Sequence, residues 1–143
     1  MDYYVLAREL MSLKSGIKHI QFDRTMSKLN QGGLFVLNYL VDHQKTAYPK
    51  DLSKSMVVST ARIATILNHL EKDDFITRTT DPKDNRQIIV KLTEKGNKYI
   101  QKQRNEMLEN VVKMLECLGP EDALAYIRIQ KKLINNIYNE KNN

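Results

Sequence analysis

The sequence predicts a mostly helical α+β protein in which one β-hairpin interrupts a series of helices. Apolar residues recur every three or four positions over most of the 143 residues, which is the spacing of a helix face that packs against a core. Between residues 75 and 92 the spacing changes to every second residue, and two runs rich in β-branched side chains flank a turn with Pro and Asp. With 41% apolar and 28% charged residues, the composition is ordinary for one globular domain.

The first helix is predicted over residues 4–20. Its apolar side chains step by four, three, four and three positions, which is the seam of a helix that packs on other helices. These residues are Leu6, Leu10, Leu13, Ile17 and Ile20. A second helix is expected after Asn30, a residue type that caps helices, although Gly32 and Gly33 weaken its first turn.

A short helix, a turn and a longer helix are predicted next. Pro49 suits the first position of the short helix, and Ser59 suits the amino-terminal cap of the longer one, which extends to Asp73. The longer helix combines an apolar stripe with a small, polar face on the opposite side. The stripe is Ile63, Ile66, Leu67 and Leu70, and the polar face is Ala61, Thr65, Asn68 and Lys72, flanked by Arg62 and His69. This order of elements predicts a helix-turn-helix.

Two more helices are predicted in the last third of the chain. Thr93 is a suitable cap for a long helix, with Glu94 favourably placed at its positive end, and the apolar pattern continues to Leu118. Gly119 then predicts a stop and Pro120 the start of a final helix. Helices from both chain ends would therefore enclose the helix-turn-helix and the hairpin in the sequence.

Positive charge is concentrated around the hairpin. The net charge is +6, and residues 49–104 hold 12 Lys and Arg against 7 Asp and Glu. A basic hairpin directly after a helix-turn-helix is the order of a winged helix, in which one helix fits the DNA major groove and the hairpin lies over the neighbouring minor groove. Arg86 would enter the minor groove, whose negative potential attracts a guanidinium, and Asp84 would orient it. A simple exposed ion pair between Asp84 and Arg86 is the alternative interpretation.

The segment LSKSMVVSTARIATILNHLEKDDFITRTTDPKDNRQIIVKLTEKG, residues 52–96, resembles the DNA-binding region of the MarR family of bacterial transcription regulators. The shared features are an Asp, any residue, Arg pattern in the hairpin, a following strand, and LTEKG. The resemblance implies a winged helix-turn-helix at residues 31–96, with dimerisation helices from residues 1–30 and 97–143 in one compact unit. It also implies a homodimeric regulator, expected to be a repressor, that reads a pseudo-palindromic operator in double-stranded DNA.

The resemblance also implies site residues by position. The candidates for the major groove are Thr60, Arg62, Thr65 and His69, and the candidate for the minor groove is Arg86, with Asp84 beside it. The candidates for phosphate positioning are Ser59, Lys54, Lys72 and Arg78. A small-molecule effector is implied as well, in a cleft near the first and second helices, with His19 and Tyr39 as weak lining candidates.

The chain departs from the family pattern at three positions. Asp74 stands at the end of the recognition helix, where relatives usually have Gly in a left-handed conformation. Val57 stands in the helix-turn-helix turn, where Gly is frequent. Thr65 stands where many relatives have Arg, so direct guanine readout from that position is not expected.

Other classes of function find less support. No phosphate-binding glycine loop, nucleophile elbow or zinc-protease pattern occurs, and the three histidines are scattered, so no enzyme, metal site or cofactor is predicted. A winged helix that binds proteins and a redox-responsive regulator that uses the single cysteine, Cys117, stay as alternatives. No apolar run is long enough to span a membrane and one cysteine fits a reducing compartment, so a cytoplasmic protein is expected.

Overall fold

The computed structural model describes residues 1–17 and 31–141, and the elements below are those of this part of the chain. The helices are α1 (Tyr3–Ile17), α2 (Gln31–Asp42), α3 (Pro49–Met56), α4 (Thr60–Lys72) and α5 (Glu94–Lys141), and the strands are β1 (Thr46–Ala47), β2 (Ile76–Thr80) and β3 (Ile88–Leu92). The predicted mostly helical class with one hairpin is therefore confirmed. The last residues of the predicted first helix and the expected cap Asn30 lie outside the described residues.

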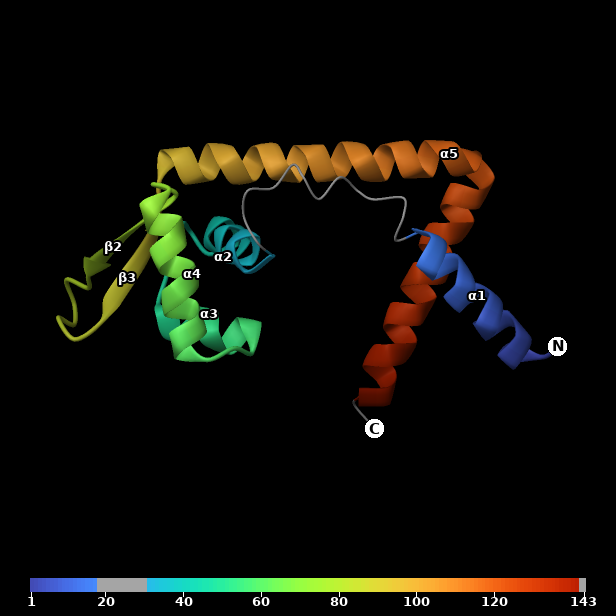
Figure 1. Ribbon diagram of the computed structural model, residues 1–143, viewed down its shortest axis with the longest axis horizontal. Helices are drawn as coiled ribbons and strands as arrows, with labels where there is room; N and C mark the ends of the chain where they lie inside the picture. Colours follow the sequence, from blue (N-terminus) through green and yellow to red (C-terminus); the bar gives the residue numbers. More distant parts are fainter. Residues whose placement is uncertain (18–30, 142–143) are drawn as a thin grey trace.

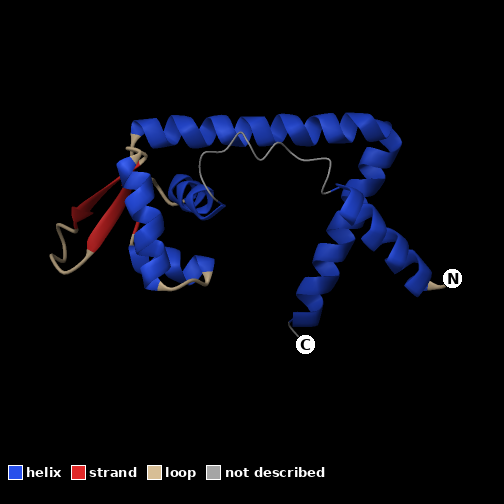
Figure 2. Cartoon of the chain, in the orientation of Figure 1, coloured by secondary structure: helices blue, strands red, loops and turns tan. Residues whose placement is uncertain are grey.

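The long helix α5 connects two parts of the molecule (Figure 1). One end of α5 joins the unit formed by α2, α3, α4 and the sheet, while α1 lies toward the other end. The described strands all belong to the first of these parts, and the far part is helical (Figure 2). The helix-turn-helix and its hairpin thus extend from one end of a helical body.

A sharp bend divides α5 at Gly119. This residue has φ 75° and ψ 167°, a conformation that is open to glycine and strained for other residues, and Pro120 follows it. The predicted stop and restart of the helix at this point are confirmed. The segment after the bend turns back in the direction of the winged-helix end (Figure 1).

The sheet is antiparallel, with the strand order β1-β3-β2. Residues of β2 and β3 pair along the whole hairpin, from Ile76 opposite Leu92 to Thr80 opposite Ile88. The strand β1 was not predicted, because two residues are too short to show an alternating pattern. Its pairing of Ala47 with Val90 ties the hairpin to the chain segment between α2 and α3.

The core lies between α2, α3, α4 and the inner face of the sheet. Ten large side chains are almost completely buried in this cluster, and one of them, Ile100, brings the first turns of α5 into it. All four residues of the predicted stripe on α4 are buried: Ile63, Ile66, Leu67 and Leu70. Burial of this stripe fixes the rotation of α4 and leaves its opposite face toward solvent.

Candidate DNA-binding interface

The turn between α3 and α4 is held by backbone and hydroxyl contacts. Val57 has φ 54° and ψ 48°, which is the left-handed conformation usually taken by Gly, and the Ser53 hydroxyl donates to the Val58 carbonyl oxygen at 2.6 Å. Ser59 then caps α4, because its hydroxyl oxygen accepts a hydrogen bond from the Arg62 backbone N–H at 3.2 Å. The predicted cap at Ser59 and the predicted start of α3 at Pro49 are both confirmed.

The outer face of α4 is open to solvent. Each major-groove candidate and each α3 or α4 phosphate candidate is exposed: Thr60, Arg62, Thr65, His69, Ser59, Lys54 and Lys72. The Thr65 hydroxyl donates to the Ala61 carbonyl oxygen at 3.1 Å within the same helix. On the same face, Asn68 accepts a hydrogen bond from Arg78, and Ser59 serves as the helix cap. The side chains of Thr60, Arg62, His69, Lys54 and Lys72 make no hydrogen bond or ion pair within the described residues, so they are available to a partner.

The hairpin that follows α4, residues 76–92, forms the wing, and Arg86 lies in its loop. Asp84 accepts hydrogen bonds from the Arg86 backbone N–H at 3.0 Å and from the Gln87 side-chain amide at 3.2 Å. The Asp84 carboxylate therefore holds the backbone of the loop at Arg86. The predicted contact was with the Arg86 guanidinium, which the carboxylate does not bond. Among the described residues the exposed Arg86 guanidinium has no partner, so it is free to reach an external anion.

The base of the wing loop is tied to the helix-turn-helix by Asp81, which is 4% exposed. Its carboxylate accepts a hydrogen bond from the Tyr48 hydroxyl at 2.6 Å and another from the Lys83 backbone N–H at 2.9 Å. The Tyr48 hydroxyl is the main cause that lowers the pKa of the Asp81 carboxyl, and the same bond raises the pKa of Tyr48. Tyr48 immediately precedes Pro49, so the contact joins the wing to the start of α3.

Arg78 on β2 lies against the outer side of α4. Its guanidinium donates to the Glu71 carboxylate from Nε at 3.1 Å and to the Asn68 side-chain oxygen at 2.8 Å. The contact with Arg78 lowers the pKa of the Glu71 carboxyl. This arrangement gives Arg78 a structural role between α4 and the wing and leaves fewer of its donors for a phosphate.

Arg104 on α5 connects the helical body to the winged helix. It donates to the Asn38 side-chain oxygen at 2.7 Å and to the Asp42 carboxylate at 2.9 Å, both on α2. Together with the burial of Ile100, these contacts fix the angle at which α5 leaves the winged helix. The position of α4 relative to the helical body depends on this joint.

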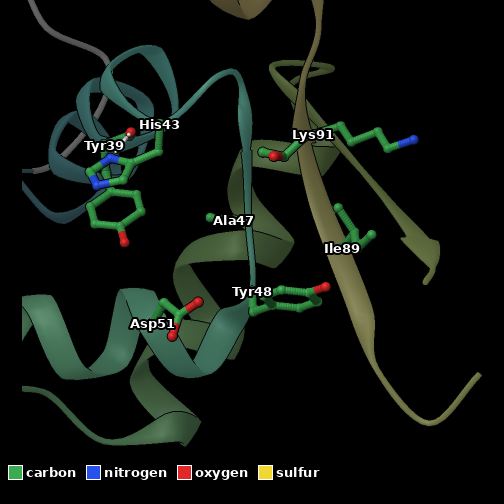
Figure 3. Close-up of a pocket in the computed structure, with 8 residues that line it drawn as sticks. Tyr39, His43, Ala47, Tyr48, Asp51, Ile89 and Lys91 are labelled. Carbon is green, nitrogen blue, oxygen red and sulfur yellow. Dashed lines mark hydrogen bonds between the residues drawn. The ribbon is translucent and has the colours of Figure 1, made fainter. Parts of the chain in front are cut away.

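A pocket of about 260 Å³ lies between the end of α2, β1, the start of α3 and β3 (Figure 3). Tyr39 and His43 form one wall as parallel stacked rings with centroids 3.7 Å apart. The remaining lining residues are Thr46, Ala47, Tyr48, Asp51, Ile89 and Lys91. Tyr39, a predicted lining residue, lines this pocket from α2. The predicted cleft, between the dimerisation helices and the winged helix, stays a prediction. His19, the other candidate, lies outside the described residues.

Several features bear on the other classes of function. Within residues 1–17 and 31–141, no group of three or more His, Cys, Asp or Glu side chains is placed to hold a metal ion. No helix in that part of the chain is long and apolar enough to cross a membrane. Cys117 is exposed on α5, close to the bend at Gly119.

Three contacts of the interface were not predicted from the sequence: Tyr48 with Asp81, Arg78 with Glu71, and Arg104 with Asn38 and Asp42. Each joins residues from different elements, and the partners of the first and third are 33 and at least 62 positions apart. The sequence signal available was weak in each case, since an Asp in a turn and an Arg on a helix are common. Only the tertiary fold brings these polar groups together.

The helix-turn-helix, the exposed face of α4 and the basic wing define a winged-helix DNA-binding protein. The sequence profile of the family described as Transcriptional regulator SarA/Rot matches residues 18–103. The chain belongs to this family of transcription regulators, and the MarR-type resemblance predicted from residues 52–96 is confirmed. The curated relatives include two HTH-type transcriptional regulators of Bacillus subtilis. YdgJ is 28% identical over a match that covers 78% of this chain and 67% of YdgJ. YkoM is 28% identical over a match that covers 91% of this chain and 82% of YkoM.

Solved structures share the fold over nearly the whole chain. The YusO protein of Bacillus subtilis has a TM-score of 0.82 at 24% identity, covering 94% of this chain and 98% of its own. A MarR family protein of Bacillus stearothermophilus has a TM-score of 0.73 at 19% identity, covering 96% and 99%. The MepR protein of Staphylococcus aureus in complex with DNA has a TM-score of 0.64 at 21% identity, covering 94% and 96%.

Proposed function

We propose that this transcription regulator is a homodimer that reads a pseudo-palindromic operator, with α4 in the major groove and the wing over the minor groove. The observation that carries the proposal is the exposed, polar face of α4 beside a wing whose Arg86 guanidinium has no partner in the described part of the chain. A protein of the same fold, MepR, forms a complex with DNA, which supports the same use of the fold here.

The groove contacts are assigned by side-chain chemistry. Arg62 and His69 carry donors for base edges, while Thr60 and Thr65 can contact bases through hydroxyl and methyl groups. Lys54, Lys72 and the Ser59 hydroxyl are suited to phosphates, and Arg86 is suited to the negative potential of a narrow minor groove. Arg78 contributes mainly by holding the wing against α4 through Glu71.

The homodimer is supported by apolar side chains that the single chain leaves in water. On α1, Leu10 is 54% exposed and Leu13 is 58% exposed, and on the last segment of α5, Leu124 is 74% exposed. Large exposed apolar surfaces mark interaction sites, and each Leu that becomes fully buried contributes about 1.5 to 3 kcal/mol. A second copy of the chain, packed through the helices of both ends, would cover these residues and place two copies of α4 on one face.

Repression is the proposed regulatory outcome. A dimer that spans two half-sites covers the intervening DNA and excludes other proteins from it. A repressor must be in the compartment that holds the DNA, so the cytoplasm is the proposed location. No catalytic role is proposed.

A small-molecule effector is proposed on the basis of one relative and the pocket. The MepR protein of the same fold has been solved bound to ethidium bromide. In this chain the stacked Tyr39 and His43 rings and the Asp51 carboxylate give the pocket a surface suited to planar, cationic compounds. A ligand bound in this pocket would lie against β3 and Tyr48 and could thereby shift the wing. The coupling free energy between ligand binding and DNA binding is typically about 1 to 3 kcal/mol.

Two alternatives have a weaker basis. A protein-binding winged helix would not require the exposed cationic side chains on α4 and the wing. A redox-responsive regulator would use Cys117, which is exposed near the bend of α5.

The test is a salt series of binding to duplex DNA from upstream of the protein's own coding region, with unrelated DNA of equal length as control. The proposal expects a specificity ratio of about 10³ or more and a steep fall of affinity with salt. Equal affinity for both duplexes would contradict sequence-specific binding and favour the protein-binding alternative.

A further inference from the structure

The wing loop is a small self-bonded unit. The Asp81 backbone N–H donates to the Gln87 carbonyl oxygen at 2.9 Å, and the Gln87 N–H donates to the Asp84 carbonyl oxygen at 2.9 Å. The Asp84 carboxylate accepts from the Arg86 N–H at 3.0 Å. These contacts connect Arg86 to the base of the loop, so movement of Asp81 would move the backbone that carries Arg86.

Tyr48 is the side chain that fastens this unit to the rest of the winged helix. Its hydroxyl donates to Asp81 at 2.6 Å, and the receiving carboxylate is 4% exposed. The backbone of Tyr48 is itself fixed, because its carbonyl oxygen accepts from Asp51 and Leu52 in the first turn of α3, and Leu52 is fully buried. A rigid point of the helix-turn-helix thus holds the loop.

We propose that the hydrogen bond from Tyr48 to Asp81 is a positioning contact for DNA binding, which sets the place of Arg86 relative to α4. The inference rests on the proposed function, because the position of Arg86 affects DNA binding only if Arg86 contacts the minor groove. A loop held before DNA arrives has less conformational entropy to lose when Arg86 enters the groove, so the contact raises affinity without touching the DNA.

Several observations support a positional role over a role in the core. The bond joins a charged acceptor to a neutral donor, which is the stronger class of hydrogen bond. The bond also changes the pKa values of both groups, raising that of Tyr48 and lowering that of Asp81. The β1–β3 pairing and the contact of Arg78 with Glu71 hold the strands of the wing, whereas the Tyr48 contact is made at the loop beyond them.

The test is a double-mutant cycle with Tyr48→Phe and Arg86→Ala, measured by anisotropy on the upstream duplex. Tyr48→Phe removes only the hydroxyl, and we expect it to weaken binding by about 3- to 10-fold in the parent and to have almost no effect in the Arg86→Ala background. Tyr99→Phe is the matched control, because the Tyr99 hydroxyl has no hydrogen-bond partner within the described residues, and it should bind like the parent.

A second readout does not depend on DNA. Hydrogen exchange of residues 81–87 should become faster in Tyr48→Phe, while exchange in β1 and β3 stays unchanged. Asp81→Asn keeps an acceptor for the Lys83 N–H and should show a smaller change than Tyr48→Phe.

The outcomes separate the two proposals. If Arg86→Ala weakens binding but Tyr48→Phe does not, or if Tyr48→Phe weakens it equally in both backgrounds, the positioning role is overturned and the wing contact stands. If Arg86→Ala binds like the parent, the wing contact fails, and the positioning role fails with it. Unchanged exchange of residues 81–87 in Tyr48→Phe would also overturn the positioning role.

Discussion

The backbone carbonyl oxygen of Phe75 lies directly against Gly96, so close that a Cβ on residue 96 would be 2.1 Å from it. The same oxygen accepts a hydrogen bond from the Thr93 N–H at 3.1 Å, and the Phe75 ring stacks on Tyr99 with centroids 4.6 Å apart. The contact joins the start of the wing to the first turn of α5. It explains physically why Gly ends the segment LTEKG.

Gly96→Ala should therefore lower the free energy of unfolding by about 1 to 3 kcal/mol, because the added methyl group meets backbone that cannot turn aside. Thermal unfolding followed by circular dichroism measures this. Asn97→Ala, one position further along the same helix, serves as the control and should change the stability much less. A Gly96→Ala variant as stable as the parent would contradict the packing described.

Val57→Gly should stabilise the protein. Val57 is a β-branched residue with φ 54°, and such a residue in the left-handed region costs about 1 to 2 kcal/mol. Its side chain is 90% exposed, so its removal loses little burial. Allowing for the greater freedom of Gly in the unfolded chain, we expect a gain of about 1 kcal/mol in urea unfolding. A loss of stability would show that the Val57 side chain has a contact of its own.

Two substitutions at Ser59 separate its folding role from its proposed phosphate role. Ser59→Asp keeps an oxygen acceptor for the Arg62 N–H, so stability should stay near that of the parent, while the added charge should repel phosphate and weaken DNA binding. Ser59→Ala removes the cap and should cost about 1 kcal/mol of stability. Chemical unfolding and binding to the upstream duplex, measured on the same samples, test both. If Ser59→Asp bound DNA like the parent, Ser59 would lie away from the phosphates.

Leu13→Asp should dissociate the dimer and abolish DNA binding. Leu13 is 58% exposed in the single chain, so the substitution disturbs little packing among the described residues and acts mainly where a second copy would bury the residue. Sedimentation velocity measures the oligomeric state. Arg8→Asp introduces the same residue on the opposite side of α1 and should remain dimeric. A Leu13→Asp variant that stays dimeric would show that α1 uses another surface.

Much of the fold could be predicted because local patterns determine it. Ser59 and Thr93 are caps whose side chains make the expected hydrogen bonds, and Gly119 has a positive φ of 75° with ψ 167°, a conformation that is open to glycine and ends the helix there. Asp74 also has a positive φ of 60°, as expected for a position where relatives have Gly. In these cases each signal depends on neighbours within a few positions.

The contacts that set the geometry of the interface could not be predicted in the same way. The expected partner of the Asp84 carboxylate was the Arg86 guanidinium, yet the carboxylate bonds to the Arg86 backbone, since an Asp in a turn reaches N–H groups two positions ahead. Arg78 was a predicted phosphate contact, but in the folded protein its guanidinium lies beside the Glu71 carboxylate. Such contacts depend on the packing of whole elements against one another.

Binding of a dimer to both grooves can be tested by a hydroxyl-radical footprint of the upstream duplex with the parent protein and with Arg86→Ala. A dimer with α4 in the major groove and Arg86 in the minor groove predicts two protected half-sites about one helical turn apart, related by a two-fold axis. In Arg86→Ala the flanking minor-groove protection should disappear, and affinity should fall by about 1 to 3 kcal/mol while the fold is kept. A single protected patch, or flanking protection that survives in Arg86→Ala, would contradict this mode of DNA binding.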